Sequence, residues 1–159
     1  MTKLSRAVVV EAPPENVFRV LENLDALPYL YNCVCDVSDV RGTGDHIGDT
    51  FRGTFSVIGL QFDVVFTRTE RTPPLKMVDR FEGAMNGIMA FRLEPRGGAT
   101  SVSLDVDYEI SKGLLGRIVN RILFVQVAEK NAERVLENLA VAVETTGANP
   151  RTKATAETS

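Results

Sequence analysis

Apolar and polar residues alternate with a period of two through residues 51–66 and 87–108 of this chain. Because successive side chains of a strand point to opposite faces, the alternation predicts two β-hairpins, which turn at Ile58-Gly59 and Gly97-Gly98. Counting outward from the first turn pairs Val57 with Leu60, Phe55 with Phe62, Gly53 with Val64 and Phe51 with Phe66. The second turn pairs Leu93 with Val102, Phe91 with Leu104, Met89 with Val106 and Gly87 with Tyr108. Each hairpin therefore has one apolar face that another element must cover.

The cover is predicted by apolar residues that recur at helical spacing between Leu114 and Glu144. Further strand patterns occupy residues 4–11, 34–40 and 75–82, and two short helical patterns lie between the first two strands. The predicted fold is α+β: seven antiparallel strands curved around a long C-terminal helix, in the order strand, two helices, six strands, helix. A hollow between sheet and helix is where we expect the functional site.

Length and composition predict one domain over residues 1–144 and a disordered tail over 145–159. A chain of 159 residues is large enough for a core of its own, whereas the last 15 residues include no large apolar side chain.

The strand register predicts which side chains face the hollow. The predicted ligand-binding residues are Phe51, Phe55, Phe62, Phe66, Arg68, Met77, Asp79, Met89, Phe91, Leu104, Tyr108 and, from the helix, Ile122. Nearly all are apolar, as is usual for a pocket that holds a small molecule.

Three polar side chains on these faces are candidates for catalysis: Asp79, Tyr108 and Glu129. A carboxylate that faces an apolar hollow must be paired or neutralised, so Asp79 either forms a structural pair with Arg68 or contacts a ligand. Tyr108 donates its hydroxyl either to a ligand or to a backbone carbonyl. Glu129 is the one charge on the predicted inner stripe of the helix. It either forms an acid/base pair with Asp79 or extends to the edge of the stripe.

Three large apolar residues, Leu123, Phe124 and Val127, fall off the predicted inner stripe of the helix. Exposed apolar groups this close together are typical of an interface. We therefore expect a partner chain in a homodimer, a membrane surface or a loop of this chain to cover them.

Charge and hydropathy exclude several classes of function. The net charge of −3 comes from mixed acids and bases, which argues against nucleic-acid binding. The chain has no apolar run long enough to span a membrane, and residues 1–6 lack the features of a signal peptide. We expect a cytoplasmic protein.

No metal or cofactor is predicted. Cys33 and Cys35 stand two residues apart and His46 is the only histidine, so the ligands that zinc prefers are too few. The two cysteines are expected to be small buried hydrophobic residues on one face of a strand. The Gly-x-Gly of residues 42–44 is followed by a strand pattern, whereas a dinucleotide site requires a helix there.

Four segments carry a resemblance to a known family: residues 12–18 (APPENVF), 21–30 (LENLDALPYL), 47–50 (IGDT) and 91–100 (FRLEPRGGAT). With the element order, they make residues 3–144 similar to the helix-grip fold of the START and birch-pollen-allergen superfamily (SRPBCC). The chain looks most like its polyketide cyclase/dehydrase-like families. Such families often have a tryptophan near residues 27–30, where this chain offers Tyr29 or Tyr31.

The resemblance implies a central cavity, because superfamily members bind lipids, sterols, polyketides or plant hormones. It carries no catalytic motif that spans the family. The favoured function is therefore binding of a small hydrophobic ligand such as a lipid, an isoprenoid or an aromatic polyketide. The alternatives are a polyketide cyclase or dehydratase, and an accessory protein that acts at a membrane or on a partner, like relatives linked to carbon-monoxide dehydrogenase maturation.

Overall fold

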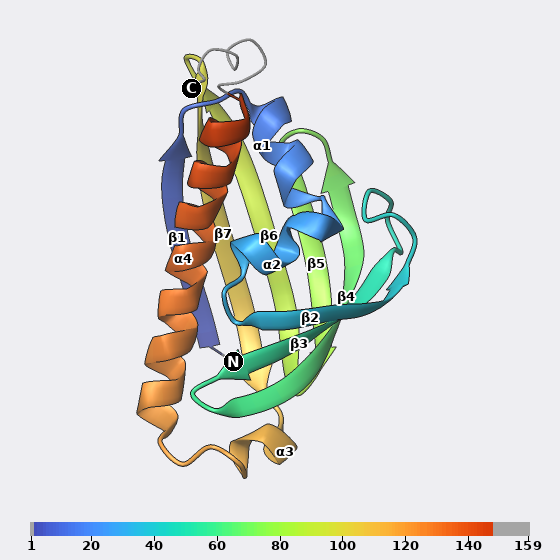
Figure 1. Cartoon of the computed structure of the whole chain (residues 1–159), viewed down its shortest axis with the longest axis vertical. Helices are drawn as coiled ribbons and strands as arrows, with labels where there is room; N and C mark the ends of the chain where they lie inside the picture. Colours follow the sequence, from blue (N-terminus) through green and yellow to red (C-terminus); the bar gives the residue numbers. More distant parts are fainter. Residues whose placement is uncertain (1, 148–159) are drawn as a thin grey trace.

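The computed structural model describes residues 2–147, and seven of their segments form one antiparallel sheet in the spatial order β1-β7-β6-β5-β4-β3-β2. The strands are β1 (Thr2–Val10), β2 (Val34–Arg41), β3 (Thr50–Val57), β4 (Leu60–Thr72), β5 (Lys76–Gly83), β6 (Met85–Arg96) and β7 (Ala99–Ile110). Consecutive strands from β2 to β7 are neighbours, and β1 closes the far edge by pairing with β7. Figure 1 shows the sheet curving around the C-terminal helix, as the predicted helix-grip fold requires.

Both predicted hairpin registers are confirmed. Phe51 lies opposite Phe66 and Phe55 opposite Phe62, while Phe91 lies opposite Leu104. Each turn has two residues at positive φ: 41° and 82° at Ile58 and Gly59, and 56° and 95° at Gly97 and Gly98. Turns of this kind twist in the same sense as the strands that they join, so they fix the register locally.

Short helices cover the end of the concave sheet face that lies nearest the C-terminal end of the last helix (Figure 1). Helix α1 (Pro14–Leu21) begins at a proline, which suits a first helical turn, and buries Val17, Phe18 and Leu21. The turn η1 (Leu24–Ala26) and helix α2 (Leu27–Leu30) follow, and α2 buries Leu27 and Leu30. These apolar groups close that end of the core.

The predicted continuous helix is interrupted. Helix α3 (Lys112–Leu115) ends before Gly116, residues 116–120 are not helical, and helix α4 (Arg121–Gly147) begins anew. The Asn120 side chain accepts a hydrogen bond from the backbone N–H of Leu123 at 3.0 Å, which is the usual way for asparagine to cap a helix start. The restart rotates the inner stripe of α4, which now includes Phe124, Val135, Leu136, Leu139 and Val143.

Helix α4 ends three residues beyond the predicted boundary at residue 144. The rest of the predicted tail, residues 148–159, lies outside the described residues. Within residues 2–147, no helix is both long and apolar enough to cross a bilayer.

Candidate functional site

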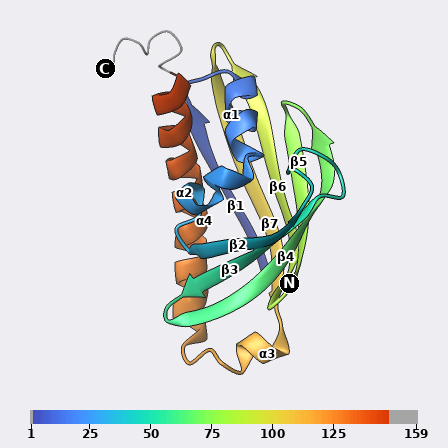
Figure 2. The same cartoon turned by 45° about the vertical axis from the view of Figure 1, so that its right-hand side comes forward.

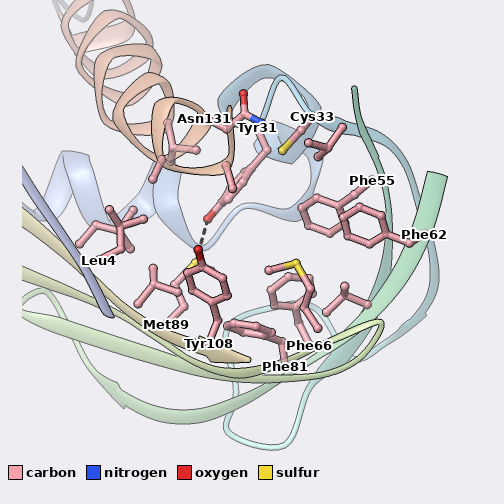
Figure 3. A pocket seen from close by; sticks show the side chains of 18 of the residues that line it. Leu4, Tyr31, Cys33, Phe55, Phe62, Phe66, Phe81, Met89, Tyr108 and Asn131 are labelled. Atoms are coloured by element: carbon pink, nitrogen blue, oxygen red, sulfur yellow. Dashed lines mark hydrogen bonds between the residues drawn. The ribbon is translucent and has the colours of Figure 1, made fainter. Parts of the chain in front are cut away.

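A cavity of about 130 Å³ lies between the concave face of the sheet and α4. Figure 3 shows its aromatic wall, which the strands supply. The rings that line it from the sheet are Phe55, Phe62, Phe66, Phe81 and Tyr108, and α4 contributes Phe124, Ala128, Asn131, Ala132 and Val135. Two alanines on the helix face large residues on the sheet, so the space between them stays unfilled.

The aromatic wall is built from rings in mutual contact. Phe55 and Phe62 stack with centroids 5.7 Å apart, and Phe66 meets Phe81 at 5.6 Å. Phe62 also lies 6.2 Å from Phe124, which joins the sheet to the first turn of α4. Such contacts restrict the rings, so the wall is expected to keep its shape when a ligand enters.

Two tyrosine hydroxyls converge in the cavity from opposite sides (Figure 3). Tyr108 extends from β7, and its buried hydroxyl has no hydrogen-bond partner among the described residues. Tyr31 follows α2, and its hydroxyl donates to the sulfur of Met89 at 3.7 Å, a weak interaction. Burial raises the pKa of both phenols, and the nearby Asp79 raises that of Tyr31 further. Both phenols are therefore neutral, and the Tyr108 hydroxyl is the one without a hydrogen-bond partner among the described residues.

The remaining polar lining is sparse. Cys33 lines the cavity, and burial raises the pKa of its thiol to about 11. Cys35 is exposed and donates to the carbonyl of Thr54 at 3.4 Å, so the expectation that the two cysteines share a buried face is wrong. The reason is that Cys33 stands in the turn before β2, and the pairing of β2 shifts between Val34 and Asp36.

Arg68 and Asp79 lie opposite each other on β4 and β5, beside a separate void of about 20 Å³. The Arg68 Nε donates to Asp79 Oδ1 at 2.5 Å, and both side chains are about 95 % buried, with 4 % and 5 % exposed. A second Arg68 nitrogen donates to the Gly44 carbonyl. Burial raises the pKa of Asp79, and the Arg68 guanidinium opposes that rise. Arg68 and Asp79 therefore have their hydrogen-bond partners within the protein.

The glycine-rich loop is held in place by Asp49. One oxygen of its carboxylate accepts backbone hydrogen bonds from Thr43, Gly44 and His46 at 2.8–3.2 Å. Asp45, His46 and Asp49 place potential metal ligands within 4.8 Å of one another, on exposed or half-buried positions. The hydrogen bonds to Asp49 account for the cluster as a loop anchor, which packs Gly44 against Arg68.

Glu129 does not approach Asp79. It lies 3.7 Å from Arg6 of β1 and lines neither cavity. Because α4 begins after the interruption, Ala128 and Ala132 take the inner positions and Glu129 faces the edge of β1. Of the two alternatives for Glu129, the described structure has the one in which it extends to the edge and forms no acid/base pair with Asp79.

The new start of the helix after residue 120 also changes which apolar residues of its first turns are buried. Ile122 was expected in the hollow but is 73 % exposed, so that prediction is wrong. Phe124 was expected on the outer surface but is fully buried and lines the cavity, and Val127 is half-buried against the core. Only Leu123 of the predicted outer group is exposed, at 43 %.

The other predicted ligand-binding residues divide into three groups. Those that line the main cavity are Phe55, Phe62, Phe66, Met89, Leu104 and Tyr108. Those that line only the smaller void are Phe51, Arg68, Met77 and Asp79. Phe91 is buried in the core and lines neither.

Comparison with known proteins places this cavity in context. Residues 1–144 match the model of the family described as polyketide cyclase / dehydrase and lipid transport. The chain belongs to this family. No functionally curated protein matches it in sequence.

Solved structures share the fold of this member of the polyketide cyclase / dehydrase and lipid transport family at low identity. TTHA0849 from Thermus thermophilus is 20 % identical with a TM-score of 0.76, over 91 % of this chain and 99 % of that one. The ZhuI aromatase/cyclase from Streptomyces sp. R1128 is 17 % identical with a TM-score of 0.76, over 96 % and 97 %. A START superfamily protein from Mycobacterium smegmatis is 15 % identical with a TM-score of 0.73, over 91 % and 98 %.

Sequence reasoning missed several cavity residues of this family member, among them Tyr31, Phe124 and Ala128. Asn120 was the available signal for two of them, since a helix that starts there has Phe124 and Ala128 on one face. Cys33 was expected to be buried, and it lines the cavity.

Proposed function

We propose that this protein binds a small, neutral, hydrophobic molecule in the main cavity, with one polar atom of that molecule hydrogen-bonded to Tyr108. The observation that carries the proposal is the buried Tyr108 hydroxyl, which has no partner among the described residues. A buried polar group without a hydrogen bond costs about 1–3 kcal/mol. A ligand that supplies the missing partner recovers that free energy.

The lining supports a neutral ligand. Among the described residues that line the main cavity, none has a charged side chain. The nearest buried cation, Arg68, already binds Asp79 and the Gly44 carbonyl. A carboxylate moved from water into such surroundings loses its hydration without gaining a counter-charge, which costs several kcal/mol.

The volume supports a ligand of about one ring. An apolar protein cavity of about 150 Å³ is known to hold one benzene molecule, and this cavity measures about 130 Å³. A substituted aromatic ring or a short isoprenoid therefore matches it. A longer lipid or a fused polyketide exceeds this volume.

Polyketide cyclase or dehydratase activity is the second candidate, favoured by the family description and by the fold shared with an aromatase/cyclase. Such chemistry needs a positioned acid or base. Asp79 is held by Arg68 and Glu129 by Arg6, so the two tyrosines are the groups available to a substrate carbonyl. Two neutral phenols suit binding and orientation better than proton abstraction, so we favour the binding function.

Titration calorimetry with three one-ring probes tests the proposal. At neutral pH, 4-ethylphenol offers a neutral polar group, ethylbenzene offers none and 4-ethylbenzoate carries a charge. We expect 4-ethylphenol to bind at least about tenfold more tightly than 4-ethylbenzoate, because the desolvated carboxylate finds no cation. Tyr108→Phe should weaken 4-ethylphenol binding about three- to tenfold, the value of one hydrogen bond, and leave ethylbenzene binding unchanged or tighter.

Tyr29→Phe is the matched control, because Tyr29 is 78 % exposed and should affect neither probe. Equal losses for 4-ethylphenol and ethylbenzene in Tyr108→Phe would show that the variant alters shape rather than hydrogen bonding. Failure of both neutral probes to bind the wild type would contradict the proposal.

A further inference from the structure

Apolar side chains gather at the end of the molecule where α4 begins. We define the basal patch as Ile58, Val119, Ile122 and Leu123. Val119 is fully exposed, and Ile122, Ile58 and Leu123 are 73 %, 44 % and 43 % exposed. Figures 1 and 2 both place the β3–β4 turn, which contains Ile58, beside the first turns of α4. Arg117 lies in the segment before α4, and its side chain links this segment to β4 by donating to the Gln61 carbonyl at 2.9 Å.

Ile58 is exposed at a conformational cost. Its φ of 41° lies in the left-handed region, which β-branched residues rarely adopt. Asparagine or glycine suits such a turn position better. An exposed isoleucine here gives up stability in the free protein, and contact with an apolar phase would compensate for that loss.

The chain segment that carries most of the basal patch is basic. From residue 112 to 128 the chain has Lys112, Arg117 and Arg121 and no acidic residue, although the whole protein has a net charge of −3. All three basic residues are exposed, and none of them forms an ion pair with another described residue. Arg121 lies in sequence between Val119 and Ile122, so the cations border the apolar groups directly.

We propose that the basal patch docks the protein on an anionic membrane surface. Its apolar side chains would enter the interfacial layer while Lys112, Arg117 and Arg121 meet lipid phosphates. A second copy of this chain is the less suitable occupant, because a two-fold contact would bring like charges together in a partly desolvated interface. The anionic lipid surface supplies both the apolar phase and the opposite charge.

Docking in this way would bring the end of the cavity to the bilayer. Leu123 of the patch precedes Phe124, and Ile58 follows Val57, and both Phe124 and Val57 line the main cavity. A hydrophobic ligand could then pass between membrane and cavity without crossing water. The docking itself does not depend on the proposed ligand, so the two can fail separately.

Vesicle co-sedimentation tests the proposal with the intact chain. Wild-type protein should bind vesicles of equimolar phosphatidylglycerol and phosphatidylcholine, release them as salt is raised, and bind pure phosphatidylcholine weakly. Ile122→Glu should weaken binding about tenfold or more, as loss of one buried apolar side chain predicts. Arg121→Gln should weaken it about fivefold, the effect of one basic residue near an anionic surface.

The same helix provides matched controls. Val141 is 65 % exposed near the other end of α4, and Arg134 is exposed at its middle. Val141→Glu and Arg134→Gln should bind vesicles like the wild type. Because the chain has no tryptophan, Val119→Trp also introduces a single reporter, whose emission should shift to shorter wavelength with anionic vesicles while that of Val141→Trp does not.

Three outcomes would overturn the proposal. The first is a wild-type protein that ignores anionic vesicles or binds uncharged ones equally well. The second is equal weakening by Ile122→Glu and Val141→Glu. The third is a wild-type dimer in light scattering that Ile122→Glu converts to a monomer, which would assign the basal patch to a second copy of the chain.

Discussion

Arg68 and Asp79 show how a single pair of residues can be polar, buried and structural. They lie opposite each other on β4 and β5, so their charged groups are in direct contact. Burial of either charge alone would be very unfavourable. Here each charge neutralises the other, and the Gly44 carbonyl accepts a further hydrogen bond from Arg68. The residue that instead lacks a partner is Tyr108, which is why the proposed ligand contact lies there and not at Asp79.

Asp79→Asn is expected to lower the free energy of unfolding by about 3–5 kcal/mol, because it leaves the Arg68 charge buried without a counter-charge. Ligand affinity should change little, since Asp79 does not line the main cavity. Urea denaturation and calorimetric titration with 4-ethylphenol measure the two effects. Asp107→Asn is the control, because its ion pair with Lys3 is exposed and should contribute less than about 1 kcal/mol. A large loss of affinity with unchanged stability would assign Asp79 to the ligand.

Among the elements, the register of the two hairpins was predictable from local sequence, whereas the phase of the last helix was not. Each hairpin register depends on its own turn and on a period of two, and both are readable in a short stretch of sequence. The last helix is interrupted at residues 116–120, and the cap at Asn120 sets a new phase. An error of one position in that phase exchanged the predicted environments of Ile122 and Phe124.

The phase of α4 can be tested by shortening two neighbouring side chains. Phe124→Ala should lower the free energy of unfolding by about 3–5 kcal/mol, because it removes a buried ring that contacts Phe62. Leu123→Ala should cost less than about 1 kcal/mol, since Leu123 is 43 % exposed. Chemical denaturation measures both. Similar small losses at the two positions would favour the uninterrupted helix that begins at Leu114.

For the whole molecule, the proposed function depends on the volume that the core leaves unfilled. The sheet, the short helices and α4 bury most large apolar residues, yet Ala128 and Ala132 face the aromatic wall across about 130 Å³. Close packing is the rule inside proteins, so a void of this size lowers stability unless a ligand occupies it. A ligand of the proposed kind would supply the missing contacts.

Ala132→Leu should fill part of the cavity, and the sign of its effect on stability distinguishes a void from a packed core. We expect the free energy of unfolding to rise by about 0.5–2 kcal/mol, as cavity-filling substitutions commonly achieve, while 4-ethylphenol binding falls at least tenfold. Overpacking of a solid core would instead cost about 1–3 kcal/mol. Ala140→Leu is the control on the same helix, because Ala140 packs against the core outside the cavity and should give no gain. Loss of stability in Ala132→Leu would contradict the proposed cavity.

The sequence by itself determined the register of the two hairpins and the apolar face of the sheet. These features follow from a period of two and from turns of two residues, which act over short distances along the chain. Only the tertiary structure decided that Tyr31 faces Tyr108, that Phe124 closes the cavity and that Glu129 turns away from it. Each of these depends on how segments far apart in the chain pack together, and on the volume that remains after they do. A local pattern of residues encodes neither the packing of distant segments nor the volume left between them.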